Sequence, residues 1–200
     1  MNTIIIYDAE YWSDEGCLKR NWQGPNDKPP YLIQLSATKV ALEPNLKELE
    51  TLSVYVSPID VNGNPIRLTK YFEKLTHITE SKLKQNAIPI PDAFKQMKAF
   101  FGNLLCFSYG GDETKIKISA TDWQQPMPMA EANCRDVKNI LRQGGMREED
   151  IKSNSSGMLA QFHNLPFTGH VHDASDDVQS IITTLRHYLK EGKLTLNDFN

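Results

Sequence analysis

Residues 3–10 read Thr-Ile-Ile-Ile-Tyr-Asp-Ala-Glu, and this stretch decides how the rest of the chain is interpreted. Three consecutive β-branched isoleucines predict a strand that is buried on both faces. Successive side chains on a strand alternate, so Asp8 and Glu10 project from the same face at its end. Two close carboxylates repel each other, and a divalent cation between them removes the repulsion. The alternative is a strand that leaves into a polar loop, with both acids solvated.

Composition and length favour an ordinary soluble protein. The 200 residues fit one domain, 1–200, with a substantial core, and 40% are hydrophobic and 24% charged. The net charge of -3 excludes a global basic field, so a nucleic-acid partner needs a local basic strip or bound metal. Cys17, Cys106 and Cys134 form no Cys-x-x-Cys pair, which argues against a cysteine-based zinc site.

The chain shows no targeting or membrane segment. Its N-terminus enters a strand directly, without the charged and apolar regions of a signal peptide. No apolar run approaches the ~20 residues that a membrane helix needs. Because a sparse, odd number of cysteines also suits a reducing compartment, we expect a cytoplasmic protein without a membrane partner.

A long loop follows the first strand, since Gly, Pro, Asn and Asp punctuate residues 11–30. Its aromatic and cationic side chains include Tyr11, Trp12, Lys19, Arg20 and Trp22. Aromatic rings stack on bases and cations pair with phosphates, so this mixture is typical of contacts with single-stranded nucleic acid. The alternative is that the tryptophans pack the loop onto the body of the protein.

The remaining periodicity predicts an α/β domain with a mixed central sheet of about five strands flanked by helices. We expect further strands over residues 31–42, 52–56, 104–109 and, at an edge, 131–137. We expect helices over residues 69–75, 80–84, 93–101, 113–123, 135–141, 156–162 and 174–190. The first three strands are spaced as an antiparallel meander.

Further acids and a base stand at the ends of predicted elements. Asp112 follows the fourth strand, and His172 and Asp177 flank the start of the last helix. Asp173 and Asp176 also lie there, where capping and the helix dipole favour acids. Capping is our interpretation of Asp173. It does not require Asp177, which lies within the helix and can return to the acids of the first strand.

Taken in order, these residues resemble the DnaQ-like or DEDD exonucleases, in their histidine subtype (DEDDh). The family pattern is Asp-x-Glu, a later Asp and His-x4-Asp, which here correspond to Asp8-Ala9-Glu10, Asp112 and His172-x4-Asp177. Residues 31–37 and 75–79 resemble a strand and the Leu-Thr-Gly-Ile-Thr stretch of the branch that trims histone mRNA and small RNAs. The resemblance spans about residues 3–190, and its specificity lies in the ordered set.

The chain departs from the family at several positions. Tyr11 and Trp12 follow Glu10, where the family has a small residue, and His77 stands where glycine is common.

Two assignments have a neighbouring rival. Glu113 could serve in place of Asp112, although Asp112 places Ile116 at an apolar position of the next helix. His170 could serve as the base, although the five-residue step to Asp177 favours His172.

The resemblance implies an RNase H-like fold and 3′–5′ exonuclease activity on single-stranded ends, with RNA favoured over DNA. It implies two Mg²⁺ or Mn²⁺ ions, both bridged by Asp8, with Glu10 and Asp177 on the ion that binds the attacking water and Asp112 on the other. His172 is the implied general base. Substrate contacts are expected from Tyr11, Trp12, Leu75 and Thr76, with Leu75 wedged against the terminal base and Trp12 stacked on it. The alternatives are a DNA-directed or short-oligonucleotide exonuclease and a catalytically silent binding module.

Overall fold

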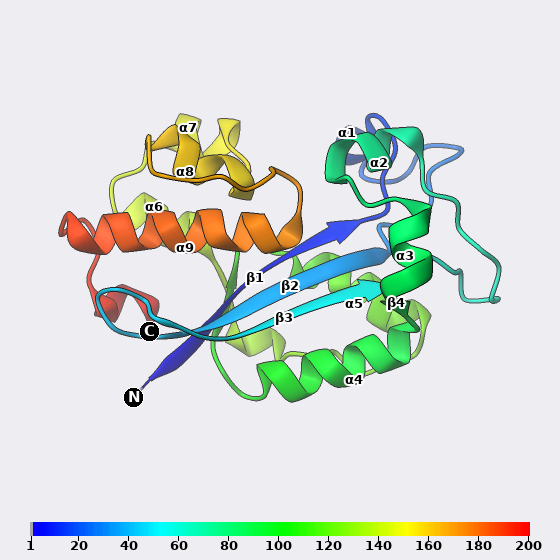
Figure 1. Ribbon diagram of the computed structural model, residues 1–200, viewed down its shortest axis with the longest axis horizontal. Coiled ribbons are helices and arrows are strands. Elements are labelled where there is room, and N and C mark those ends of the chain that lie inside the picture. The colour runs from blue at the N-terminus through cyan, green and yellow to red at the C-terminus, as the bar shows by residue number, and fades with distance from the viewer. Residues whose placement is uncertain (1) are drawn as a thin grey trace.

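A computed structural model describes residues 2–200 and shows a six-stranded mixed sheet with helices on both faces (Figure 1). The strand order is β4-β3-β2-β1-β5-β6. The strands are β1 (Thr3–Tyr11), β2 (Leu32–Ala41), β3 (Glu48–Val56), β4 (Ala87–Ile88), β5 (Cys106–Ser108) and β6 (Cys134–Asp136). The predicted α/β class is confirmed. The sheet has one strand more than expected, because the two residues of β4 are too few to produce a periodic signal.

The helices agree closely with the predicted ranges. They are α1 (Cys17–Arg20), α2 (Lys70–Thr76), α3 (Glu80–Asn86), α4 (Ile90–Phe101), α5 (Glu113–Asp122), α6 (Val137–Gln143), α7 (Glu148–Ser153), α8 (Leu159–Phe162) and α9 (Ala174–Lys190). The short α1 and α7 were not predicted, since each buries a single side chain, Cys17 and Ile151, and so lacks an apolar face. The predicted strand over 131–137 shrinks to β6, preceded by a 3₁₀ turn.

Strand β1 lies at the centre of the sheet and is buried on both faces, as predicted. It pairs with β2 antiparallel and with β5 parallel, and β2 pairs with β3 antiparallel, which confirms the meander. Ile4 and Ile6 face a core shared with α6, α7 and α9, whereas Ile5 and Tyr7 face a core shared with α4 and α5. The isoleucine run therefore supplies both cores from one strand.

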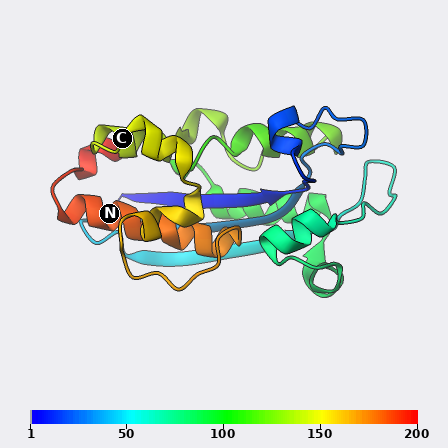
Figure 2. The ribbon, with the colours of Figure 1, turned by 90° about the horizontal axis from the view of Figure 1, so that it is seen from above.

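Two groups of helices flank the C-terminal end of β1 (Figures 1 and 2). Helices α6 to α9 lie on one side, and α1 to α3 lie on the other. Strand β1 runs from the first group toward the second, so its last residues lie between them.

A third core fixes the loop after β1 and accounts for its tryptophans. Trp12 is buried with Phe72 and Ile78, and its Nε1–H donates to the carbonyl oxygen of Arg67 at 3.0 Å. The Nε1–H of Trp22 donates to the carbonyl oxygen of Trp12 at 2.8 Å. The interpretation that the tryptophans pack this loop onto the body is confirmed.

Two cysteines distant in sequence meet in the sheet. Cys106 and Cys134 are paired residues of β5 and β6, with their sulfur atoms 3.6 Å apart. Cys17 belongs to the third core instead. Among residues 2–200, no helix is long and apolar enough to cross a bilayer.

Candidate active site

The end of β1 presents two acids on the face that α9 covers. Asp8 and Glu10 alternate with Tyr7 and Ala9 and share the face of Ile6. Both side chains are largely buried, with exposed fractions of 6% and 9%. The predicted projection of the two acids from one face is what the strand geometry produces.

Strand β2 holds the first turn of α9 against these acids. Ser36 and Gln34 are the β2 residues paired with Asp8 and Glu10. The hydroxyl oxygens of Ser36 and Ser175 lie 2.8 Å apart, and the Ala174 N–H donates to Gln34 Oε1 at 3.4 Å. These bonds fix the start of α9 over the end of β1.

Asp177 lies one turn into α9 and points into the site. Its carboxylate accepts a hydrogen bond from Ser156 Oγ at 2.7 Å and one from the His172 N–H at 3.1 Å. Asp173 caps the helix, accepting from the Ser175 N–H at 3.0 Å. The predicted cap at Asp173 is confirmed, and Asp177 takes no part in capping.

Asp112 reaches the same place from the loop between β5 and α5. Gly110 and Gly111 both adopt left-handed backbone, with φ of 105° and 78°, which turns the chain sharply after β5. The Asp112 N–H donates to Ser108 Oγ at 3.2 Å, and the Tyr11 hydroxyl donates to the Asp112 carbonyl oxygen at 3.0 Å.

Glu113, the rival of Asp112, points elsewhere. Its carboxylate accepts from the hydroxyl of Tyr7, which lies on the opposite face of β1. Asp112 lines the cavity at the end of β1 and Glu113 does not.

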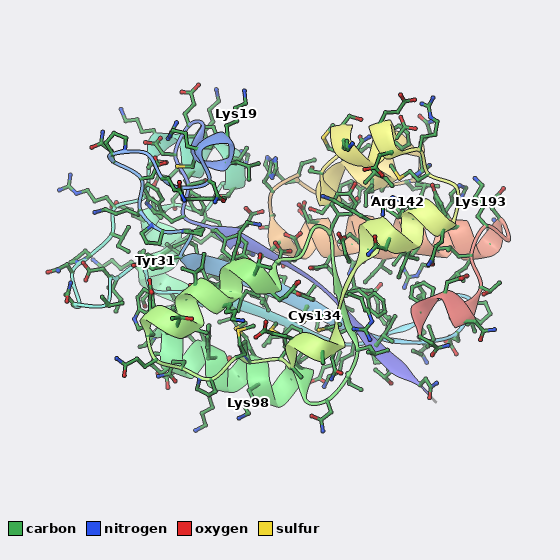
Figure 3. All side chains as sticks on the ribbon, turned by 180° about the vertical axis from the view of Figure 1, so that it is seen from behind. Lys19, Tyr31, Lys98, Cys134, Arg142 and Lys193 are labelled. Carbon is green, nitrogen blue, oxygen red and sulfur yellow. The ribbon has the colours of Figure 1, made fainter. Side chains whose placement is uncertain are left out.

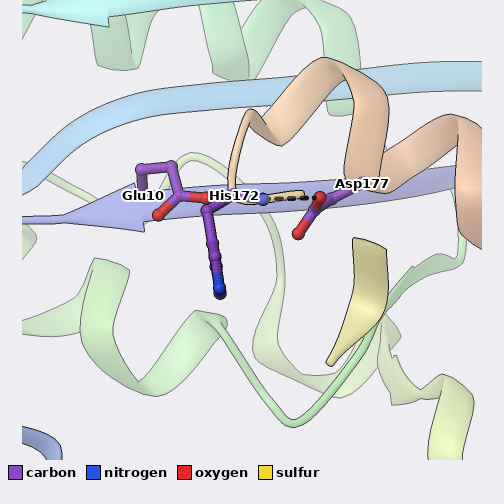
Figure 4. Close-up of side chains that lie close together, drawn as sticks. All are labelled: Glu10, His172 and Asp177. Carbon is purple, nitrogen blue, oxygen red and sulfur yellow. Dashed lines mark hydrogen bonds between the residues drawn. The ribbon is translucent and has the colours of Figure 1, made fainter. Parts of the chain in front are cut away.

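The cavity has a volume of about 730 Å³ and collects all five residues of the family pattern. They are Asp8, Glu10, Asp112, His172 and Asp177. Glu10, His172 and Asp177 each offer a ligand atom, and these atoms lie within 4.8 Å of one another (Figure 4).

The carboxylates oppose one another electrostatically. Burial first, and then the charges of Asp177 and Asp112, raise the pKa of Asp8 and the pKa of Glu10 well above the usual values. Burial raises the pKa of Asp112 to about 7, against the opposing charge of Lys115, whose Nζ lies 3.8 Å from Asp112 Oδ1. Burial raises the pKa of Asp177 to about 6, and the hydrogen bond from Ser156 opposes that rise.

This donor set fits divalent metal ions. Four buried carboxylates supply hard oxygen ligands, and the negative charge that they would carry exceeds what Lys115 can balance. Asp8, Glu10, Asp112 and Asp177 are the residues that would hold such ions.

His172 lies just before α9, beside Asp177. Its backbone is left-handed, with φ of 71°, and its N–H is bound to Asp177. Burial first, and then the charge of His170, lowers the pKa of His172, so its ring is neutral at pH 7 and can accept a proton. The rival His170 does not line the cavity; its ring stacks on that of His77, with centroids 3.7 Å apart.

The four residues expected to contact substrate separate into two pairs. Tyr11 and Leu75 line the cavity. Trp12 lies in the third core, and Thr76 donates from Oγ1 to the Phe72 carbonyl oxygen at 2.9 Å. Neither Trp12 nor Thr76 lines the cavity, so the expected stacking of Trp12 on a base does not fit its position.

Other residues of the site gave no signal in the sequence. Ser108 and Ser156 bind the site acids, and Gly157 packs directly against the Asp177 carboxylate. Serine and glycine are common residues, so the sequence does not distinguish these three. Only the folded chain brings them next to the acids. The backbone at His77 is left-handed, with φ of 57°. Glycine adopts this conformation without strain, which accounts for glycine being common at this position in the DEDDh pattern.

No model of a known protein family matches the chain, and no curated protein sequence matches it. Solved structures do. The nuclease domain of 3′hExo, a DEDDh family member bound to rAMP, superposes with a TM-score of 0.71 at 17% identity, over 96% of this chain and 93% of that one. The cell-death related nuclease CRN-4 gives a TM-score of 0.65 at 20% identity, over 96% of this chain and 65% of that one. E. coli exonuclease I in complex with a dT13 oligonucleotide gives a TM-score of 0.67 at 12% identity, over 94% of this chain and 41% of that one.

The chain therefore has the same fold as these nuclease structures. The predicted RNase H-like architecture is thereby confirmed. The chain spans 61% of a full-length 3′-exonuclease that it also matches, at 15% identity and a TM-score of 0.72.

In this DEDDh fold, Gly157→Ala should weaken metal binding without removing any functional group. The added methyl would collide with the Asp177 carboxylate and lie 3.0 Å from the Val171 backbone. We expect Mn²⁺ affinity to fall about 10-fold or more, measured by isothermal titration calorimetry. Met158→Ala, on the same turn but 41% exposed, is the matched control. Unchanged Mn²⁺ affinity in Gly157→Ala would contradict the packing argument.

Asp112→Asn should stabilise the metal-free protein in a pH-dependent way. The folded-state pKa of about 7 lies above the unfolded value, so the folded chain holds an extra proton between about pH 4 and 7, and stability from this group falls as pH rises through that window. Asparagine cannot ionise. With chelator present, the melting temperature of Asp112→Asn relative to wild type should rise from pH 4 to 7 and then level off.

For a domain of this size, the melting temperature shifts by roughly 2–4 °C for each kcal/mol of change in the free energy of unfolding. Asp92→Asn, at an exposed acid of α4, is the control and should show no such rise. If the wild type melted at a higher temperature than Asp112→Asn at pH 8, the raised pKa of Asp112 would be contradicted.

Proposed function

We propose that this protein is a metal-dependent 3′–5′ exonuclease that hydrolyses single-stranded nucleic acid, with RNA favoured over DNA. The observation that carries the proposal is the assembly of Asp8, Glu10, Asp112, His172 and Asp177 in one cavity of a DEDDh fold. In the sequence these residues lie on three separate segments.

Known structures with this fold support nucleic acid as the substrate class. One is a 3′-exonuclease that recognises the 3′ end of a histone mRNA stem-loop, and another is exonuclease I bound to dT13. They include both RNA and DNA. RNA is favoured because residues 75–79 resemble the RNA-trimming branch and because the 3′hExo domain is covered over 93% of its length.

The four carboxylates are proposed to hold two Mg²⁺ or Mn²⁺ ions. When bound, such ions lower the pKa of a coordinated water and stabilise the charge on the attacked phosphate. The acids must lose their protons to bind them, and Lys115 assists at Asp112 by favouring its ionised form.

His172 is proposed to take the proton from the attacking water. Its lowered pKa keeps the ring neutral, and its N–H bond to Asp177 fixes its position beside the carboxylates. Leu75 and Tyr11 line the same cavity and are proposed to contact the terminal nucleotide.

The first test compares wild type and Asp8→Asn on 5′-labelled single-stranded RNA and DNA of one sequence, with Mn²⁺. We expect a ladder that shortens from the 3′ end, faster on RNA, and absent in Asp8→Asn. A faster DNA ladder would reverse the sugar preference. Cleavage restricted to very short strands would favour the short-oligonucleotide enzyme. No cleavage by wild type despite bound Mn²⁺ would favour a silent binding module.

The second test separates the two candidate bases. His172→Ala should lower turnover by about 10²- to 10⁴-fold, because it removes the proton acceptor. His170→Ala is the matched control, two residues away and outside the cavity, and should keep turnover within a few-fold. If the two variants exchanged these effects, His170 would be the base.

A further inference from the structure

One wall of the cavity carries two lysines, and the proposed chemistry uses only one of them. Lys138, near the start of α6, and Lys115, on α5, both line the cavity and are only partly exposed. They stand on either side of the loop that carries Asp112. Lys115 favours the ionised form of Asp112, but the proposed hydrolysis gives Lys138 no role, so this second cation requires a separate account.

Lys138 is held in place by an aromatic ring. Its Nζ lies 4.7 Å from the centre of the Tyr109 ring, and Tyr109 is itself fixed by a bond from its hydroxyl to the Ile151 carbonyl oxygen at 2.8 Å. A methyl group built on Gly110 would lie 3.0 Å from the same Nζ. The ammonium group therefore packs over the turn between β5 and α5.

The charge of Lys138 is not consumed by an ion pair. Within residues 2–200, no carboxylate oxygen lies within 4.0 Å of its Nζ. Lys115 differs, since its Nζ lies 3.8 Å from Asp112 Oδ1 and 5.2 Å from the centre of the Tyr11 ring. A partly buried cation without an acid partner, facing a cavity, is suited to an anion that enters it.

A hydroxyl on the same side of the cavity also lacks a partner. Ser155 Oγ is hidden from solvent and makes no hydrogen bond to any described residue. Ser155 lines the cavity two residues beyond α7, the helix to which Tyr109 is bonded. An unpaired buried hydroxyl is costly, and a phosphate oxygen would satisfy it.

We propose that Lys138, with Lys115 and Ser155, forms a phosphate-binding wall for the backbone of the single strand, on the 5′ side of the bond that is cleaved. The proposal rests on the nuclease function and names where that substrate runs. A chain of net charge -3, with four acids in its cavity, must supply local cations to attract a polyanion. The cleaved phosphate would lie at the four carboxylates. The lysine wall would then contact the phosphates on the 5′ side of the cleaved bond.

The opposite wall differs in chemistry and so sets the orientation of the strand. Leu18, Tyr71 and Leu75, from α1 and α2, line that side, and Leu18 is 74% exposed. Lys19 lies there too, but Asp14 and Glu15 accompany it, so this side offers apolar surface without a net positive charge. Bases stack on apolar and aromatic groups, whereas phosphates pair with cations. The strand therefore enters with its bases toward α1 and α2 and its phosphates toward α5 and α6.

The test variant is Lys138→Met, because Lys115 pairs directly with Asp112 and acts on its ionisation more strongly than Lys138 does. Lys98→Met is the matched control, since Lys98 is an exposed lysine on α4, which packs on the other face of β1 (Figure 3). Lys138→Arg keeps the charge and should restore binding. Equal melting temperatures of all variants would show that the fold is intact.

Binding of a fluorescent single-stranded oligonucleotide is measured by anisotropy, with chelator present to prevent cleavage, over a series of KCl concentrations. Removing the charge that pairs with one phosphate should reduce the slope of log Kd against log salt by about 0.7. We expect this reduction, with about 5- to 10-fold weaker binding at low salt, in Lys138→Met and not in Lys98→Met.

A second measurement identifies the phosphate. Substrates carry one uncharged methylphosphonate linkage at successive positions 5′ of the cleaved bond. At one position, neutralisation should weaken wild type as much as Lys138→Met does, and should have no further effect in Lys138→Met.

The outcomes separate this proposal from the nuclease function. If wild type cleaves the strand but Lys138→Met retains the wild-type salt slope and the response to every neutral linkage, the wall is refuted while the nuclease stands. If wild type does not cleave but its binding depends on Lys138, the wall stands and the nuclease function fails.

Discussion

Mutual repulsion among four buried carboxylates is the constraint on which the rest of this structure depends. Asp8, Glu10, Asp112 and Asp177 come from three segments that have no local reason to meet. Burial, and then the charges of Asp177 and Asp112, raise the pKa of Asp8 and the pKa of Glu10 well above the usual values, so ionising these acids together is unfavourable in the metal-free fold. The cores on both faces of β1 must supply the free energy that holds the acids together.

The supporting hydrogen bonds are arranged to resist that repulsion. Ser36 and Gln34 anchor the start of α9. Ser108 accepts a hydrogen bond from the Asp112 N–H, and Ser156 donates one to the Asp177 carboxylate. Each is a polar residue in a largely apolar setting, and each is buried. Polar groups there are costly unless paired, and pairing them with the site stabilises both. The position of the acids and the folding of the sheet are therefore coupled.

Sequence reasoning succeeded where a periodic pattern or an ordered motif was long enough. The strand over residues 3–10, the meander and the 17-residue α9 were all predicted from hydrophobic patterns in the sequence. Asp173 was also recognised as the cap of α9. It failed for β4, which has only two residues, and for α1 and α7, each of which buries a single side chain. It also expected Trp12 at the substrate, because an aromatic residue beside a site motif has the same sequence signature whether it stacks on a base or fills a core.

The sequence by itself determined the α/β class, the central strand and the residues able to carry the chemistry, since alternation and helical periodicity are local properties of the chain. Only the tertiary structure decided which of the rivals enter the cavity. Asp112 and Glu113 are adjacent, and the left-handed turn at Gly110 and Gly111 sends Asp112 to the other acids of the cavity and Glu113 to Tyr7. The lysine wall is also tertiary, because side chains from α5 and α6 converge only where the chain packs around the end of β1.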